Sequence, residues 1–231
     1  WALGRARVGE NRRPGCDAVD DRVGALRLLD AETGAPLALV LRATAHANVL
    51  MRGIEGRAVI SSDWIGIARD GVAADAGCPV MIVQGAAGNV KAAGTDKVAG
   101  GSLADAERVA ASLREAARAL RFPEAAPLDA RMRCREMAFT ADVPDEAQAQ
   151  KIAADALREC GMSGEGWLAE CARLREAGVR EQTQIEPLQT LRVGDGCLCG
   201  VPYELFCETA LMASDLADAP LLFLNGYVNG C

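Results

Sequence analysis

The sequence has one histidine, His46, among 231 residues, and none of its nine cysteines forms a Cys-x-x-Cys pair. Zinc-finger spacing, which combines such pairs with nearby histidines, is therefore excluded. No apolar run approaches the ~18–20 residues that cross a bilayer, so we expect no transmembrane segment. The formal net charge is -7, with acidic and basic residues interspersed. Because nucleic-acid backbones are bound by clustered basic faces, we expect no nucleic-acid partner.

Cysteine usage favours a reducing compartment. The nine cysteines are odd in number and scattered along the chain, which is typical of small buried hydrophobic residues in the cytoplasm. A disulfide framework is the alternative. The chain starts at Trp1 with neither an initiator methionine nor a signal peptide, and it stops at Asn229-Gly230-Cys231 within a strand-and-turn pattern. We therefore expect that both ends are cut.

The hydrophobic pattern predicts a mixed α/β fold. Half of the residues are hydrophobic, which is enough for a sizeable core. Strands and helices are mixed along the chain and hairpins are present, so we expect mixed, not purely parallel, sheets flanked by helices. The predicted strands are 25–29, 37–45, 79–83, 128–140, 188–193, 197–201 and 221–224. The predicted helices are 64–76, 103–120, 144–160 and 163–177, with a further helix opened by 202–206.

Three of the predicted strands end in loops that carry polar or small residues. His46 follows the second strand, the small-residue loop 84–91 follows the third, and Glu204 lies where a late strand turns into a helix. Neutral imidazole and ionised carboxylate are ligands that Zn²⁺ accepts. The loop 84–91 permits close backbone approach to a ligand, although its spacing is not that of a phosphate-binding loop.

Each of these residues also has a structural explanation. A lone histidine can be satisfied within a loop, and Glu204 can cap a helix. Asp63, just before a predicted helix, is a plausible N-cap. Two adjacent arginines before a Pro-Gly turn, Arg12 and Arg13, can clamp a carbonyl or simply lie on a solvated loop.

Taken in order, six motifs resemble the neutral/alkaline (non-lysosomal) ceramidase family, in its N-terminal catalytic domain and in the form of a short bacterial relative. The motifs are Asn11-Arg12-Arg13-Pro14, the strand to His46, Ser62-Asp63-Trp64-x-Gly66, Gln84-Gly85-Ala86-Ala87-Gly88-Asn89, Pro202-Tyr203-Glu204-Leu205-Phe206 and Asn229-Gly230-Cys231. The resemblance implies that residues 1–231 are part of a single catalytic domain. Within it, the two predicted helices of 144–178 are charged on one side, which indicates a surface helical hairpin.

The resemblance also implies site residues. The family holds one Zn²⁺ with two histidines, a glutamate and a tyrosine, and His46 and Glu204 match the second histidine and the glutamate. The first histidine would lie before Trp1 and the tyrosine just after Cys231, so Tyr227 is the nearest substitute as a metal ligand. We therefore expect this chain by itself to bind zinc poorly and to have little activity. The resemblance places Arg12, Asn89 and Lys91 at catalytic positions and Gln84, Gly85 and Asp63 at substrate-binding positions.

The implied function is zinc-dependent hydrolysis of a linear amide in N-acyl-sphingosine or another N-acyl lipid amide. Arg12 or Lys91 would stabilise the oxyanion. Lys91 stands where ceramidases carry a serine, a departure that fits the shorter bacterial relatives better than it fits a true ceramidase. Two alternatives stay open: a hydrolase of a different ester or amide on the same scaffold, and a metal-free binding module that has lost catalysis.

Overall fold

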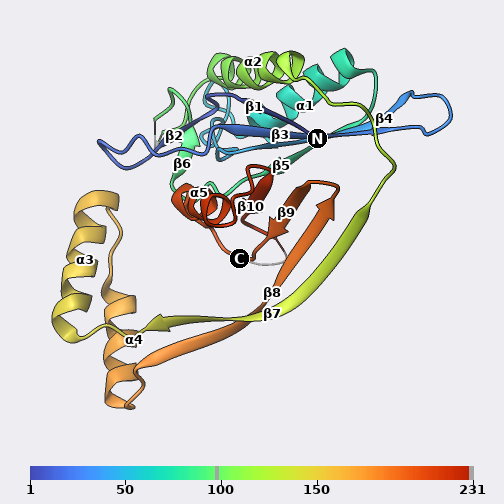
Figure 1. The fold of residues 1–231 in the computed structure, drawn as a ribbon. Helices are drawn as coiled ribbons and strands as arrows, with labels where there is room; N and C mark the ends of the chain where they lie inside the picture. Colours follow the sequence, from blue (N-terminus) through green and yellow to red (C-terminus); the bar gives the residue numbers. More distant parts are fainter. Residues whose placement is uncertain (97–98, 229–231) are drawn as a thin grey trace. The chain divides into compact units, whose positions relative to one another are not determined.

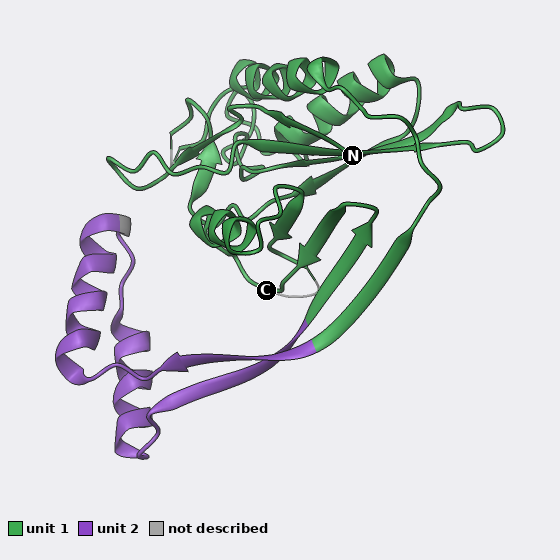
Figure 2. Cartoon of the chain, viewed as in Figure 1, with its two compact units in different colours: residues 1–135, 188–231 green, residues 136–187 purple. Residues whose placement is uncertain are grey.

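The computed structural model describes residues 1–96 and 99–228, so the predicted motif Asn229-Gly230-Cys231 lies outside the described residues. Contacts divide the chain into two compact units (Figure 2). Unit 1 contains Trp1–Arg135 and Leu188–Cys231, and unit 2 contains Glu136–Pro187. The predicted helical hairpin lies in unit 2, and all candidate site residues lie in unit 1. That both units belong to one catalytic domain stays a prediction.

The first sheet of unit 1 has the strand order β1-β3-β4-β5. Strand β1 (Ala2–Arg5) pairs antiparallel with β3 (Arg22–Leu29), which forms an antiparallel hairpin with β4 (Pro36–Ala43). Strand β5 (Val80–Gln84) pairs parallel with β4. The sheet is therefore mixed, and the predicted hairpin and mixed α/β class are confirmed.

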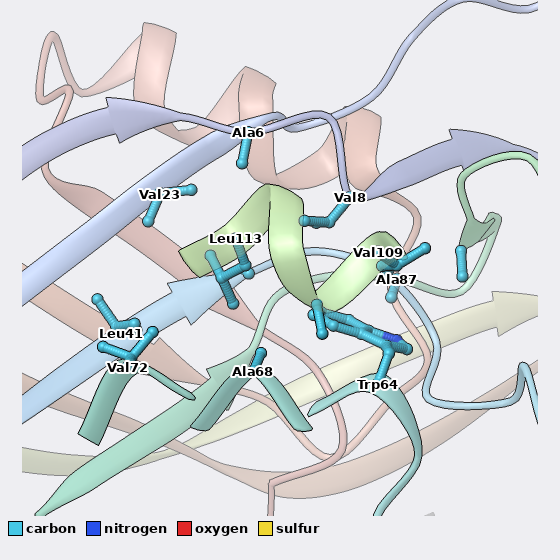
Figure 3. Packing of buried hydrophobic residues seen from close by; sticks show 14 of the residues in the cluster. Ala6, Val8, Val23, Leu41, Trp64, Ala68, Val72, Ala87, Val109 and Leu113 are labelled. Atoms are coloured by element: carbon cyan, nitrogen blue, oxygen red, sulfur yellow. The ribbon is translucent and has the colours of Figure 1, made fainter. Parts of the chain in front are cut away.

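Two helices cover one face of this sheet (Figure 1). Helix α1 (Asp63–Ala76) ends at Gly77, whose φ of 66° is the left-handed conformation that glycine adopts readily. Helix α2 (Leu103–Ala119) begins with the predicted capping box between Ser102 and Asp105. The apolar faces of both helices meet the sheet in one core, of which Figure 3 shows Leu41, Trp64, Val72, Val109 and Leu113 among others.

The second sheet has the order β10-β9-β8-β7. Strand β9 (Gly196–Gly200) pairs antiparallel with β8 (Glu181–Val193) and parallel with β10 (Leu222–Asn225), and helix α5 (Cys207–Leu216) lies between β9 and β10 in sequence. Strands β7 (Ala130–Asp142) and β8 continue from unit 1 into unit 2. Strand β8 was predicted to start at Leu188, after Pro187. It starts at Glu181 instead, and Pro187 lies within it.

A short third sheet joins β2 (Gly9–Asn11) to β6 (Val90–Ala92), two strands that the sequence pattern did not predict. Pairing places Asn11 opposite Val90. The arginine-bearing segment that follows β2 is thereby fixed beside the loop that follows β5.

The two larger sheets of unit 1 meet through Phe223 of β10. A Cβ on Gly24 of β3 would lie 2.4 Å from the Phe223 ring, so only glycine leaves room for it. The guanidinium groups of Arg22 and Arg42 each lie 5.4 Å from the same ring. Both arginines pair with the buried Asp20, at 2.7 Å and 2.8 Å. These contacts fix the ends of β4 and β10 relative to each other.

Unit 2 contains helices α3 (Glu146–Cys160) and α4 (Glu165–Glu176). Asp145 forms a capping box with Gln148, and Gly161 ends α3 in the left-handed conformation. The two helices bury small and aliphatic side chains, among them Ala149, Ala153, Cys171 and Leu174. No helix of the described residues is long and apolar enough to cross a membrane.

Candidate functional site

The candidate site lies at the ends of two pairs of parallel strands. His46 lies just after β4, and Gln84 is the last residue of β5, the parallel neighbour of β4. Glu204 and Tyr227 follow the parallel neighbours β9 and β10. Because the carboxyl ends of parallel strands share one edge of a sheet, each pair brings two polar side chains together. Contacts between the loops then join the two pairs.

Two glycines permit this close approach. The Gly88 N–H donates to the Leu205 carbonyl at 2.9 Å, and a Cβ on Gly88 would lie 2.4 Å from the Glu204 carbonyl oxygen. A Cβ on Gly226 would lie 2.5 Å from the Tyr203 carbonyl oxygen. At both positions any larger residue would push the loops apart.

The backbone of His46 is held on both sides, and its ring faces Tyr227. The His46 N–H donates to the Val90 carbonyl at 3.0 Å, and the buried Trp64 donates from Nε1 to the His46 carbonyl at 3.0 Å. Tyr227 Oη lies 3.4 Å from His46 Nε2, with the rings edge to face at 5.8 Å between centroids. Tyr227 has a φ of 63°, which is uncommon for a non-glycine residue and typical of functional loops.

Arg12 and Glu204 set the electrostatics of this pair. Burial, and then the Arg12 guanidinium, lower the pKa of His46 below its usual 6.5, while Glu204 and a backbone hydrogen bond with Gly88 oppose the shift. Burial and the Glu204 carboxylate raise the pKa of Tyr227 to about 12, against Arg12 and a hydrogen bond with Gln84. At neutral pH the imidazole is therefore neutral and the phenol protonated.

Asn89 joins three segments around the site. Its carbonyl accepts from the Arg12 N–H at 2.8 Å, its Oδ1 accepts from the Cys207 N–H at 2.9 Å, and its Nδ2 donates to Glu208 Oε2 at 2.7 Å. Glu208 in turn pairs with Arg13 at 2.8 Å. Sequence reasoning missed Glu208, although an acidic residue in the first turn of a helix, two positions into α5, was a usable signal.

Arg12 brings a free donor to the site. Its Nε is buried and has no hydrogen-bond partner within residues 1–96 and 99–228. Lys91 is engaged elsewhere: its Nζ donates to the Thr95 carbonyl at 2.6 Å and lies 3.1 Å from a carboxylate oxygen of Glu10. The two predicted oxyanion donors therefore differ in availability.

Two other predicted site residues have structural roles: Gly85 permits close packing, and Asp63 accepts hydrogen bonds from the backbone. Gly85 lies where a Cβ would be 2.2 Å from Thr44 Oγ1 and 2.4 Å from an Arg42 nitrogen. Asp63 is buried, and its carboxylate accepts from the Leu50 N–H at 2.7 Å and the Trp64 N–H at 2.8 Å.

Two predictions about helix starts were wrong. Asp63 is not the N-cap of α1: Ser62 holds that position, and Asp63 is the first helical residue with a φ of 55°. Glu204 does not open a helix either, because α5 starts only at Cys207. Glu204 is an exposed residue in the loop that precedes α5, so its carboxylate does not lie in the first turn of that helix.

No protein-family model matches the chain, and no curated protein matches it. Solved structures do. Neutral ceramidase from Pseudomonas aeruginosa matches with a TM-score of 0.52 and 18% identity, over 98% of this chain and 45% of that chain. A structure of ceramidase complexed with C2 matches with a TM-score of 0.52 and 17% identity, over 98% of this chain and 46% of that chain. The chain has a ceramidase-like fold.

At these identities the likeness is one of fold, and the chain spans less than half the length of either ceramidase structure. The ceramidase-like fold predicted from the six motifs is confirmed at that level. Within the described part of the chain, no group of three or more His, Cys, Asp and Glu side chains is arranged to hold a metal ion. The cluster on this ceramidase-like fold offers two such residues, His46 and Glu204, with a tyrosine beside them.

Proposed function

We propose that this chain belongs to a zinc-dependent hydrolase of linear amides, ceramidase-like in fold, whose substrate is an N-acyl lipid amide. The observation that carries the proposal is the convergence of His46, Glu204, Tyr227 and Arg12 from four separate segments at neighbouring strand ends. The resemblance to ceramidases, in motifs and in fold, supports the same reaction class.

The residues present fit a zinc ion in the chemistry of their donor atoms. They offer one imidazole nitrogen, one carboxylate and one phenol oxygen, which are nitrogen and oxygen ligands of the kinds that Zn²⁺ accepts. Two ligand atoms that each lie about 2 Å from one ion stand roughly 3–4 Å apart. The separation of 3.4 Å between Tyr227 Oη and His46 Nε2 falls in that range. His46, Glu204 and Tyr227 would hold the ion.

When bound, zinc would supply a lowered pKa for a coordinated water and polarisation of the scissile carbonyl. The chain's own residues supply the rest. The lowered pKa of His46 keeps its ring unprotonated at neutral pH, as a metal ligand must be. Gln84, which bonds the Tyr227 hydroxyl, lies at the same edge and can orient an amide substrate.

Arg12 is the oxyanion donor of the proposal. Its buried Nε has no partner within the described residues, so it can donate to a substrate carbonyl oxygen without first breaking a bond. A well-placed donor of this kind contributes about 3–4 kcal/mol to the transition state. Asn89 positions Arg12 through its backbone carbonyl, and Lys91 fixes the strand β6 that supports His46. Gly85 and Asp63 support the loops around the substrate.

Metal analysis of the purified chain tests the proposal. In a longer chain extended at both ends we expect zinc uptake that is lost in His46→Ala and weakened at least roughly tenfold in Glu204→Gln and Tyr227→Phe, whereas this chain by itself should take up little zinc. Glu32→Gln, at an exposed turn of the β3–β4 hairpin, is the matched control and should leave zinc uptake unchanged. If neither this chain nor a longer chain extended at both ends takes up zinc, the proposal is wrong.

A metal-free binding module is the second candidate, favoured by Lys91 at the position where ceramidases carry a serine. A substrate panel separates the candidates. Turnover of an N-acyl sphingosine and not of the matching ester supports the lipid amidase; turnover of the ester alone supports a different hydrolase. Saturable binding of both without turnover in the longer chain supports the binding module.

A further inference from the structure

Unit 1 contains a cavity of about 520 Å³ at the opposite end of the β4–β5 pair from His46. Its walls come from the β3–β4 hairpin, the last turns of α1 and α2, and the segment just before β5. Leu39 lies in the first half of β4 and Cys78 precedes β5, whereas His46 follows the end of β4. The cavity is therefore separate from the candidate zinc site, and its volume is in the range of small-molecule sites.

The inner wall of the cavity is apolar and well buried. Leu39, Val72 and Cys78 are 7%, 3% and 8% exposed, respectively, and Phe122 completes this side. These residues belong to the same core or pack against it, so the wall is part of the rigid framework of unit 1. A ligand that enters the cavity meets an apolar surface that is already formed.

The rim of the cavity has an excess of positive charge. Arg114 and Arg118 each donate two hydrogen bonds to the Asp75 carboxylate, all at 2.7–2.8 Å. Among the residues that line the cavity, one carboxylate between two guanidinium groups leaves one net positive charge; Glu115, which is not a lining residue, also acts on Arg118. Arg27 adds another: its guanidinium lies 4.4 Å from the centre of the Phe122 ring, and it has no ion-pair partner within residues 1–96 and 99–228.

We propose that this cavity binds an amphiphilic carboxylate, a molecule with one anionic head and a compact aliphatic body. The head lies beside Arg27, whose planar guanidinium offers paired donors for a carboxylate, and the body lies against Leu39, Val72 and Phe122. The Arg114–Asp75–Arg118 cluster holds α1 and α2 together at the rim and adds its net charge. The proposal uses neither His46 nor zinc, so it stands apart from the proposed hydrolase activity.

Decanoate, titrated calorimetrically below its micellar concentration, is the probe. We expect saturable binding at one site, weakened by added NaCl because the contact is ionic. Arg27→Met keeps the apolar length of the side chain and removes its charge, so it should weaken decanoate binding at least about tenfold, the loss typical of a charge-assisted hydrogen bond. Decanol should bind the unaltered protein correspondingly weakly.

Two further variants complete the experiment. Arg69→Met removes an exposed arginine of α1 that pairs with Asp70 outside the cavity, and it should bind decanoate as the unaltered protein does. Ala117→Leu adds volume to the cavity wall and should abolish decanoate binding while circular dichroism shows a folded chain. The proposal is overturned if decanoate does not bind saturably, if decanol binds equally well, or if Arg27→Met and Arg69→Met behave alike.

Discussion

Tyr227 Oη lies 3.4 Å from His46 Nε2, although the two residues are 181 positions apart in the chain. The contact exists because β4 and β10 belong to two sheets that meet through Phe223, so that the loops beyond both strands reach the same place. Arg12 and Glu204 then place a cation and an anion near both rings. The site is thus a product of how two sheets pack in unit 1.

The pKa of His46 can be measured directly, because the chain has one histidine and NMR will show one imidazole. In metal-free protein we expect a pKa below 6.5, raised by Arg12→Met and lowered further by Glu204→Gln. Since the unfolded chain binds the proton more tightly, this histidine makes stability fall as the pH drops below 6.5. A pKa that does not respond to either variant would contradict the charge arrangement.

Loss of the Asp20 carboxylate should destabilise unit 1 strongly. Asp20 pairs with Arg22 and with the fully buried Arg42, and Asp20→Asn would leave a buried guanidinium without its counter-charge. Breaking such a pair costs about 3–5 kcal/mol in the free energy of unfolding, measured with urea. Asp21→Asn, which removes the neighbouring exposed ion pair to Arg5, should cost less than about 1 kcal/mol. Equal costs would show that burial does not matter here.

Gly88→Ala tests whether close backbone approach holds the site together. The new Cβ would lie 2.4 Å from the Glu204 carbonyl oxygen, so the loops at 84–91 and 202–206 must separate. We expect a loss of about 1–3 kcal/mol in the free energy of unfolding, together with weaker zinc uptake. The control is Gly166→Ala in α4, where the Cβ meets open space and better helix propensity should stabilise by about 0.5–1 kcal/mol.

Elements with strong local signals were predictable from the sequence. Helices α2 and α3 carry capping boxes, α1 and α3 end at left-handed glycines, and the β3–β4 hairpin has turn residues between two apolar runs. Strands β1, β2 and β6 are only three or four residues long, and they exist because of partners far away in the chain, which no local period reveals.

The candidate site also combines features with a local sequence signal and features that depend on distant parts of the chain. The strand-end positions of His46 and Glu204 were predictable because each follows an apolar strand, a local feature of the sequence. The start of α5 was not predictable. Pro202 is a local signal for a helix start, but the helix begins at Cys207, whose N–H donates to the side chain of Asn89, more than a hundred positions earlier in the chain. The role of Trp64 as donor to the His46 carbonyl also depends on tertiary packing.

The Asn89–Glu208 hydrogen bond should govern the site through charge. Asn89→Asp keeps the acceptor for the Cys207 N–H but places a second carboxylate against Glu208, where Nδ2 now donates at 2.7 Å. We expect a loss of about 1–3 kcal/mol in the free energy of unfolding and a shifted His46 NMR signal at neutral pH. Like charges raise a carboxyl pKa, so the penalty should shrink as the pH falls and one carboxylate takes up a proton.

Adding Glu208→Gln to Asn89→Asp supplies the decisive control, because the glutamine amide can donate to the new carboxylate and restore the hydrogen bond in the opposite direction. The double variant should therefore recover most of the lost stability and the original His46 signal, apart from the small contribution of the exposed Arg13 ion pair. Gln150→Glu, which adds the same charge at an exposed position of α3 and outside this network, should change neither. If the double variant is no better than Asn89→Asp alone, the bond does not position the site.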